Sequence, residues 1–171
     1  SSFRTGFSSG PRRTVPFGCF PRATFQRFGS FDPRLLRNQD IEFNRRIRVG
    51  GGVVHQEGGV VSRYLAPATF RALWRKHFAN GEWNIYASRV GPRCLSRSHA
   101  VPGLFLLMVL ASALLHPFAP AALLLLQAAG NCARALMVGA GVSYWRLAWA
   151  FTLIQLAHGL GQIKGLVLLP L

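Results

Sequence analysis

The pattern of hydrophobic positions along the chain changes near residue 98. Before that point, short apolar clusters alternate with polar and glycine-rich stretches, and after it apolar residues run almost continuously. Three long apolar stretches follow, at 101–116, 118–137 and 145–169. A helix needs about 20 apolar residues to cross the hydrocarbon core of a bilayer. The pattern therefore predicts about three transmembrane helices within residues 99–171, the first of them short.

Two short helices are predicted in the first third of the chain. Residues 22–31 place Phe25 and Phe28 on one face, and residues 38–49 carry apolar side chains at helical spacing. Asn38 precedes the second helix, where its side chain would cap the first turn. Two valine pairs, at 53–54 and 60–61, predict brief strands.

Residues 67–89 predict a third helix before the apolar half begins. Aromatic and basic side chains interleave along it, and Gly81 is expected to interrupt it. This composition is typical of a helix that lies in a membrane interface. The alternative is an amphipathic helix packed inside a globular domain.

Charge divides the chain at the same place as hydropathy. The 171 residues carry 20 Lys and Arg against 5 Asp and Glu, a net charge of +15, and beyond residue 98 only three basic residues and no acids occur. The positive-inside rule then predicts an integral membrane protein with its basic N-terminal region in the cytoplasm. Nucleic-acid binding is an alternative use of the charge, but no recognisable module supports it, so no nucleic-acid partner is expected.

The three cysteines, Cys19, Cys94 and Cys132, are odd in number and widely spaced. That spacing excludes a disulfide framework and a zinc site. Polar residues also occur in the third apolar stretch, where Gln155, His158 and Gln162 share one helical face. We expect them to join this helix to another, in preference to forming an ion path.

Four motifs occur in the order found in one family of enzymes. The first motif has two parts, residues 14–20 (TVPFGCF) and 25–32 (FQRFGSFD). The other three follow in order: 37–50 (RNQDIEFNRRIRVG), 73–83 (LWRKHFANGEW) and 158–165 (HGLGQIKG). In this order they resemble membrane-anchored family 2 glycosyltransferases of exopolysaccharide biosynthesis, the succinoglycan type. The resemblance covers nearly the whole chain.

The resemblance implies a fold as well as an activity. It implies that residues 1–66 form part of the acceptor-binding half of an α/β, Rossmann-like GT-A fold. Residues 67–98 would be an interfacial helix with its linker, and residues 99–171 the membrane region. The implied activity is the inverting transfer of a sugar from a nucleotide-sugar to an acceptor. Its placement beside the membrane suggests that the acceptor is lipid-linked, and the resemblance implies a bacterial or archaeal plasma membrane.

The resemblance also implies roles for particular residues. Asp40 would be the general base, since a hydroxyl nucleophile must lose its proton as it attacks. The residue pattern alone leaves a structural role for Asp40 open, because carboxylates are favoured in the first turn of a helix. The residues expected to support Asp40 or to lie on the acceptor side are Glu42, Phe17, Gly18, Asp32 and Arg45. Arg75, His77 and Trp83 would lie on the interfacial helix and contact the diphosphate of the donor.

The donor half of such an enzyme has no counterpart in this sequence. No Asp-x-Asp motif occurs, and no glycine-rich nucleotide site precedes Thr14. We therefore expect a fragment, a truncated product or half of a split enzyme that is inactive alone. It would hold no cofactor or metal itself, whereas the full-length enzyme would use Mn²⁺ or Mg²⁺. The alternative function is a small non-catalytic membrane subunit with a basic extramembrane arm.

Overall fold

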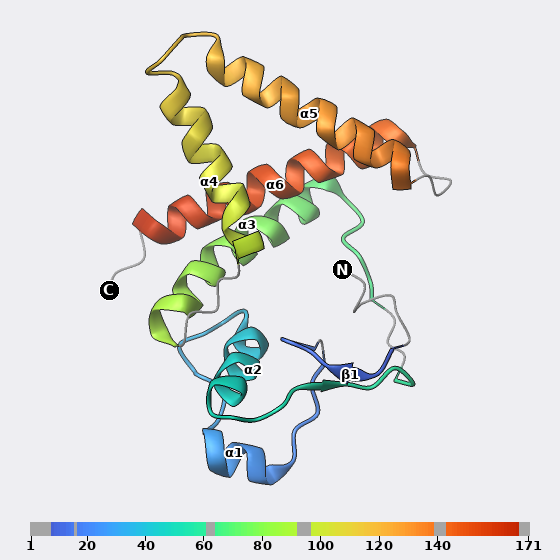
Figure 1. Cartoon of the computed structure of the whole chain (residues 1–171), viewed down its shortest axis with the longest axis vertical. Helices are drawn as coiled ribbons and strands as arrows, with labels where there is room; N and C mark the ends of the chain where they lie inside the picture. Colours follow the sequence, from blue (N-terminus) through green and yellow to red (C-terminus); the bar gives the residue numbers. More distant parts are fainter. Residues whose placement is uncertain (1–7, 16, 61–63, 92–96, 139–142, 168–171) are drawn as a thin grey trace. The chain divides into compact units, whose positions relative to one another are not determined.

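A computed structural model describes residues 8–15, 17–60, 64–91, 97–138 and 143–167 (Figure 1). The described residues group into two compact units. The first lies within Ser1–Ala66 and Trp83–Cys94, and the second lies within Pro67–Glu82 and Leu95–Pro170. The elements in chain order are β1 (Gly10–Pro11), α1 (Arg22–Phe28), α2 (Gln39–Val49), β2 (His55–Gln56), α3 (Phe70–Val90), α4 (Arg97–Ser112), α5 (Ala119–Val138) and α6 (Tyr144–Val167).

Aromatic side chains form the core of the first unit. Phe43 of α2 is fully buried, and its ring stacks on Phe25 of α1 at a centroid distance of 5.3 Å. Phe20 meets Phe43 edge-on at 4.9 Å, while Ile47 and Val54 complete the buried cluster. Aromatic pairs of this kind contribute about 0.5–1.5 kcal/mol beyond the area they bury. The two predicted helices are confirmed, and their phenylalanines hold them together.

The predicted α/β, Rossmann-like half is wrong for the residues that the structure describes. Strands β1 and β2 form one antiparallel pair, in which Gly10 lies opposite Gln56 and Pro11 opposite His55. Pro11 has no N–H to extend a ladder, and parallel strands with crossover helices are not among the described elements. The strand also begins after Val54, not at the valine pair, and Val61 lies outside the described residues.

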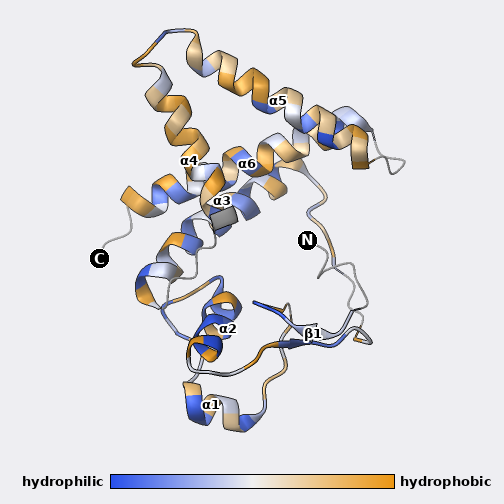
Figure 2. Ribbon diagram, viewed as in Figure 1, coloured by the Kyte–Doolittle hydropathy of each residue, from blue (hydrophilic) through white to orange (hydrophobic). Residues whose placement is uncertain are grey.

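Among the described residues, one helix is long and apolar enough to cross a membrane, and it is α5. The prediction of three transmembrane helices is therefore wrong. Helix α4 has 16 residues and contains Pro102, and its apolar part is shorter still. Helix α6 has 24 residues but includes Arg146, Lys164 and two glutamines, which lower its mean hydropathy. Figure 2 shows the hydrophobic colour concentrated on α4 and α5.

Glycines bring the helices of the second unit into close contact. A Cβ on Gly81 of α3 would clash with the backbone of His158 in α6, and one on Gly161 of α6 would clash with the backbone of Phe78. The two glycines therefore let α3 and α6 cross with their backbones touching. The predicted interruption at Gly81 is wrong: α3 runs through this position, and the absence of a side chain there makes room for α6.

Polar side chains also connect the helices of the second unit. Gln162 of α6 donates to the carbonyl oxygen of His99 at 2.6 Å and accepts from the N–H of Gly103 at 2.9 Å, both in α4. Lys164 Nζ lies 2.7 Å from Glu82 Oε1 of α3. The expected helix–helix role of Gln162 is confirmed. The charge on Lys164 is paired within the protein, which the sequence pattern does not indicate.

Candidate functional site

The first turn of α2 carries two carboxylates, Asp40 and Glu42. The helix begins after Asn38, whose backbone is left-handed with φ of 61°. The Asn38 side chain makes no cap bond to the helix, and its amide donates to Asn84 Oδ1 of α3 at 2.7 Å. The predicted capping by Asn38 is therefore wrong, because this amide is used to join α2 to the later part of α3.

Glu42 is buried, and Arg46 neutralises it from the next turn of the helix. Its side chain is 3% exposed, with Arg46 Nε 2.9 Å from Oε1 and Arg46 Nη2 2.7 Å from Oε2. This two-bond geometry is the strong form of an arginine–carboxylate pair, and it raises the pKa of Arg46. Arg46 also donates to the carbonyl oxygens of Phe28 and Ser30, at 2.5 and 3.0 Å. The pair thus fixes the segment between α1 and Asp32 against α2.

A second ion pair lies in the loop that follows α1. Arg34 donates from Nε and Nη2 to the two oxygens of Asp32, at 3.0 and 2.7 Å, and its backbone N–H donates to Oδ1 at 2.9 Å. Hydrogen bonds from the side chain and backbone of Arg34 hold the pKa of Asp32 at about 2. Arg34 Nη2 also reaches the carbonyl oxygen of Val90 at 3.3 Å, which links this loop to the end of α3.

The two ion pairs line one open pocket of the first unit. Asp32, Arg34, Glu42 and Arg46 contribute its charged groups, and the ring of Phe31 contributes an aromatic wall. Each carboxylate is matched by a guanidinium, so the pocket presents oriented donors and acceptors with no net charge. Such a surface suits a neutral, hydroxyl-rich ligand better than an anion. Of the predicted site residues, the structure brings Asp32 and Glu42 together here.

Asp40 differs from Glu42 in its environment. It is exposed, and toward the described residues its carboxylate makes no ion pair and no hydrogen bond. The guanidinium of Arg46, on the same helix, is paired with Glu42. Of two carboxylates in one helical turn, one is therefore fixed and neutralised, and the other is open to solvent.

The other residues predicted at this site lie outside the described pocket. Phe17 is 75% exposed with a left-handed φ of 55°, and Gly18 is exposed as well. Arg45 is half-buried on α2. The acceptor-side roles predicted for these three residues depend on a GT-A fold, which the described residues do not form.

The predicted residues of α3 fall into different units. Arg75 is exposed and His77 is half-buried in the second unit, where burial and the neighbouring charge of Lys76 lower the pKa of His77. Trp83 belongs to the first unit and meets Tyr86 edge-on at 5.3 Å. Their contact with a diphosphate stays a prediction.

The part of the chain that the structure describes contains no group of three or more His, Cys, Asp or Glu side chains that could hold a metal ion. Cys19 and Cys132 are free thiols on the surface, and Cys94 lies outside the described residues. No protein-family model, curated protein or solved structure matches this chain.

Sequence reasoning missed the residues that organise this site. Arg46 could have been found, because it follows Glu42 by four residues and such pairs face each other on a helix. Arg34 and Asn84 gave no comparable signal. Their partners, Asp32 and Asn38, are brought to them by loop geometry and by the packing of α3.

Proposed function

We propose that this chain supplies the acceptor side and the membrane anchor of an inverting glycosyltransferase, with Asp40 as the general base. The observation that carries the proposal is the contrast between the two carboxylates of α2. Glu42 is buried and paired, whereas Asp40 in the same turn is exposed. A general base must be reachable by the hydroxyl that it deprotonates, and Asp40 meets that requirement.

The reaction proposed is a single displacement. The acceptor oxygen attacks the anomeric carbon of the nucleotide-sugar, and its proton passes to the Asp40 carboxylate. The bond from the anomeric carbon to the diphosphate oxygen breaks, and the nucleoside diphosphate leaves with the electron pair.

The pocket between the two ion pairs supports an acceptor-side role. Its balanced donors and acceptors and the ring of Phe31 offer polar and apolar contacts to a sugar of the acceptor. The donor nucleotide-sugar would be bound by polypeptide beyond the described residues. Helix α5 would anchor the assembly in the membrane, with the basic N-terminal region on the cytoplasmic side.

The test is a sugar-transfer assay on membranes in which the gene is expressed in its natural context, so that any segment or partner that binds the donor is present. Membranes with the wild-type chain should move labelled sugar from a nucleotide-sugar into a lipid extract. Asp40→Asn should abolish this transfer, and Glu57→Gln, at an exposed carboxylate outside the site, should preserve it. Absence of transfer by the wild type would overturn the proposal in favour of a non-catalytic subunit.

A further inference from the structure

A pocket of about 280 Å³ lies between α4, α5 and α6 in the second unit. We call this pocket the α5 groove, because one face of α5 supplies most of its lining. Leu123 and Leu126 come first, Gln127 and Asn131 follow, and Arg134 stands at the end toward the helix C-terminus. Spacings of three and four residues place all five side chains on one side of a helix. The wall of the groove therefore changes from apolar to amide to cationic.

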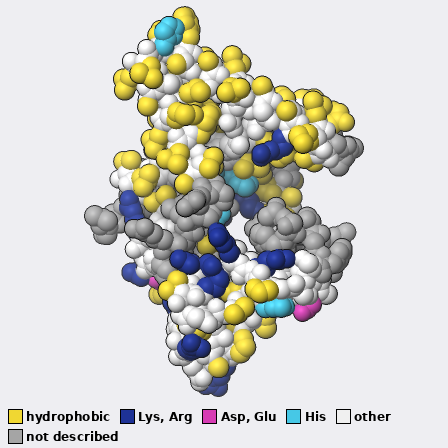
Figure 3. Space-filling model, viewed as in Figure 1, with side chains coloured by type: hydrophobic (Ala, Val, Ile, Leu, Met, Phe, Trp, Pro, Cys, Tyr) yellow, Lys and Arg dark blue, Asp and Glu magenta, His cyan; other side chains and the backbone are white. Residues whose placement is uncertain are grey.

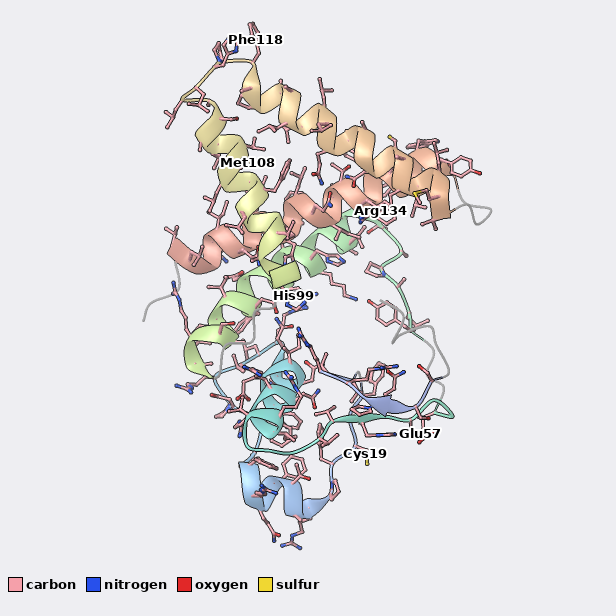
Figure 4. All side chains as sticks on the ribbon, viewed as in Figure 1. Cys19, Glu57, His99, Met108, Phe118 and Arg134 are labelled. Atoms are coloured by element: carbon pink, nitrogen blue, oxygen red, sulfur yellow. The ribbon has the colours of Figure 1, made fainter. Side chains whose placement is uncertain are left out.

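The other helices continue the same division. Phe105 and Met108 of α4 add to the apolar wall, and Gln155 of α6 adds to the polar wall. Figure 4 labels Met108 and Arg134 on their two helices. In the space-filling view, hydrophobic side chains cover much of α4 and α5 (Figure 3). A ligand with an apolar chain and a polar head matches this arrangement.

Hydrogen bonds fix the amide groups of the groove in advance. Asn131 donates from Nδ2 to Gln155 Oε1 at 3.0 Å and to Thr152 Oγ1 at 2.9 Å. Gln127 donates to the same oxygen of Gln155. Asn131 is 4% exposed, so these bonds satisfy a buried amide. The polar wall is thereby held in one arrangement before any ligand binds, which lowers the cost of binding.

Open space reaches the backbone of α5 at Gly130. A Cβ built at this position meets nothing within 4 Å, in contrast to Gly81 and Gly161, which are tightly covered. Gly130 itself lines the groove. A larger side chain at Gly130 would therefore occupy the groove without displacing a helix.

Arg134 is an exposed cation that lines the polar end of the groove. Of the five acids in the sequence, Glu82 alone falls within the second unit, Pro67–Glu82 and Leu95–Pro170. Glu82 is already paired with Lys164 at 2.7 Å. Arg134 lies near the C-terminal end of α5, the helix that can cross a membrane. From such a position an arginine extends to the level of the lipid head groups, and its guanidinium binds phosphate through paired hydrogen bonds.

We propose that the α5 groove is a binding site for an anionic membrane phospholipid. The phosphate lies against Arg134 and the amide wall, and one acyl chain lies along Phe105, Met108 and the leucines of α5. The proposal requires α5 to lie in a bilayer, and it is independent of glycosyl transfer. An inactive chain would bind the lipid equally well.

The experiment measures lipid binding to the purified full chain by native mass spectrometry. The probes are phosphatidylglycerol and phosphatidylcholine with the same acyl chains. The wild type should bind phosphatidylglycerol roughly fivefold more tightly, the factor expected for one basic residue that faces an anionic head group. Arg134→Gln should remove this preference and Arg134→Lys should retain most of it. Gly130→Leu should weaken the binding of both lipids, and Gly130→Ala should have little effect.

Arg146→Gln is the matched control. Arg146 is an exposed arginine in the first turn of α6, and it does not line the groove. Its guanidinium lies 5.5 Å from the centre of the Trp145 ring. The variant should keep the wild-type preference. Equal affinity of the wild type for the two lipids would overturn the proposal. So would an equal loss of preference in the Arg134 and Arg146 variants, or undiminished binding by Gly130→Leu. Thermal unfolding of each variant shows that it has folded.

Discussion

Glu42 and Arg46 lie one turn apart on α2, and the guanidinium of Arg46 binds both oxygens of the Glu42 carboxylate, at 2.9 and 2.7 Å. The same guanidinium reaches the carbonyl oxygens of Phe28 and Ser30, so a single side chain joins α2 to the end of α1 and to the loop beyond it. This pair is structural, and it leaves Asp40 as the accessible acid of the motif. The distinction between the two carboxylates leads to the first prediction.

Glu42→Gln should destabilise the first unit. The substitution removes the charge that Arg46 faces in a mostly buried position, and the loss of a charged hydrogen-bonding partner costs about 1–3 kcal/mol. Limited proteolysis of the full chain should then cleave between α1 and α2 at lower protease concentration than in the wild type. Glu57→Gln changes an exposed carboxylate and should leave the cleavage pattern unchanged. Wild-type protection in Glu42→Gln would show that the pair does not hold this segment.

Gly81→Ala and Gly161→Ala should each lower the melting temperature of the detergent-solubilised chain. Both positions have a neighbouring backbone in the space that a Cβ needs, so α3 and α6 would have to move apart. Gly130→Ala is the matched control in α5, where the space is open. There the change should be neutral or stabilise the helix by about 0.5–1 kcal/mol. A common response at all three glycines would contradict the packing described for α3 and α6.

Glu82 and Lys164 should behave as a coupled pair. Either Glu82→Gln or Lys164→Met alone leaves a charge without its partner between α3 and α6, and should lower the melting temperature. The double variant removes both charges, so it should lose less stability than the sum of the two single variants. Strict additivity in this double-mutant cycle would mean that the two side chains do not interact.

Asp32 should make the stability of the first unit depend on pH in the acid range. Its pKa is about 2 in the folded chain against an ordinary value of 3.8. A carboxyl group with a depressed pKa stabilises the fold above its unfolded pKa, and this contribution is lost as pH falls from about 4 toward 2. The difference in stability between wild type and Asp32→Asn should therefore shrink from pH 5 to pH 2.5. A constant difference would contradict the ion pair with Arg34.

The sequence was sufficient to predict the helices but not how they are used. Phe25, Phe28 and Phe43 are spaced for helical faces that meet, and the structure packs them together. Hydropathy alone made α6 resemble a membrane span. Its Gln162 and Lys164 side chains, however, bond to α4 and α3, a use of polar groups that hydropathy does not encode.

The site was predictable to a similar degree. The motif that contains Asp40 and Glu42 drew attention to the first turn of α2, and the pairing of Glu42 with Arg46 follows from helical spacing. The pairing of Asp32 with Arg34 and of Asn38 with Asn84 depends on loop conformation and on contacts between distant segments. Such contacts are set by tertiary packing, which local patterns do not determine.

The central claim is that Asp40 acts as the base in glycosyl transfer while Glu42 holds the fold. The most direct measurement is the initial rate of sugar transfer by native-context membranes that contain either the wild type or Asp40→Asn in equal amounts. The account predicts a fall in kcat of at least about 100-fold, the usual scale for loss of a general base, with the melting temperature unchanged. Transfer by Asp40→Asn at the wild-type rate would contradict it.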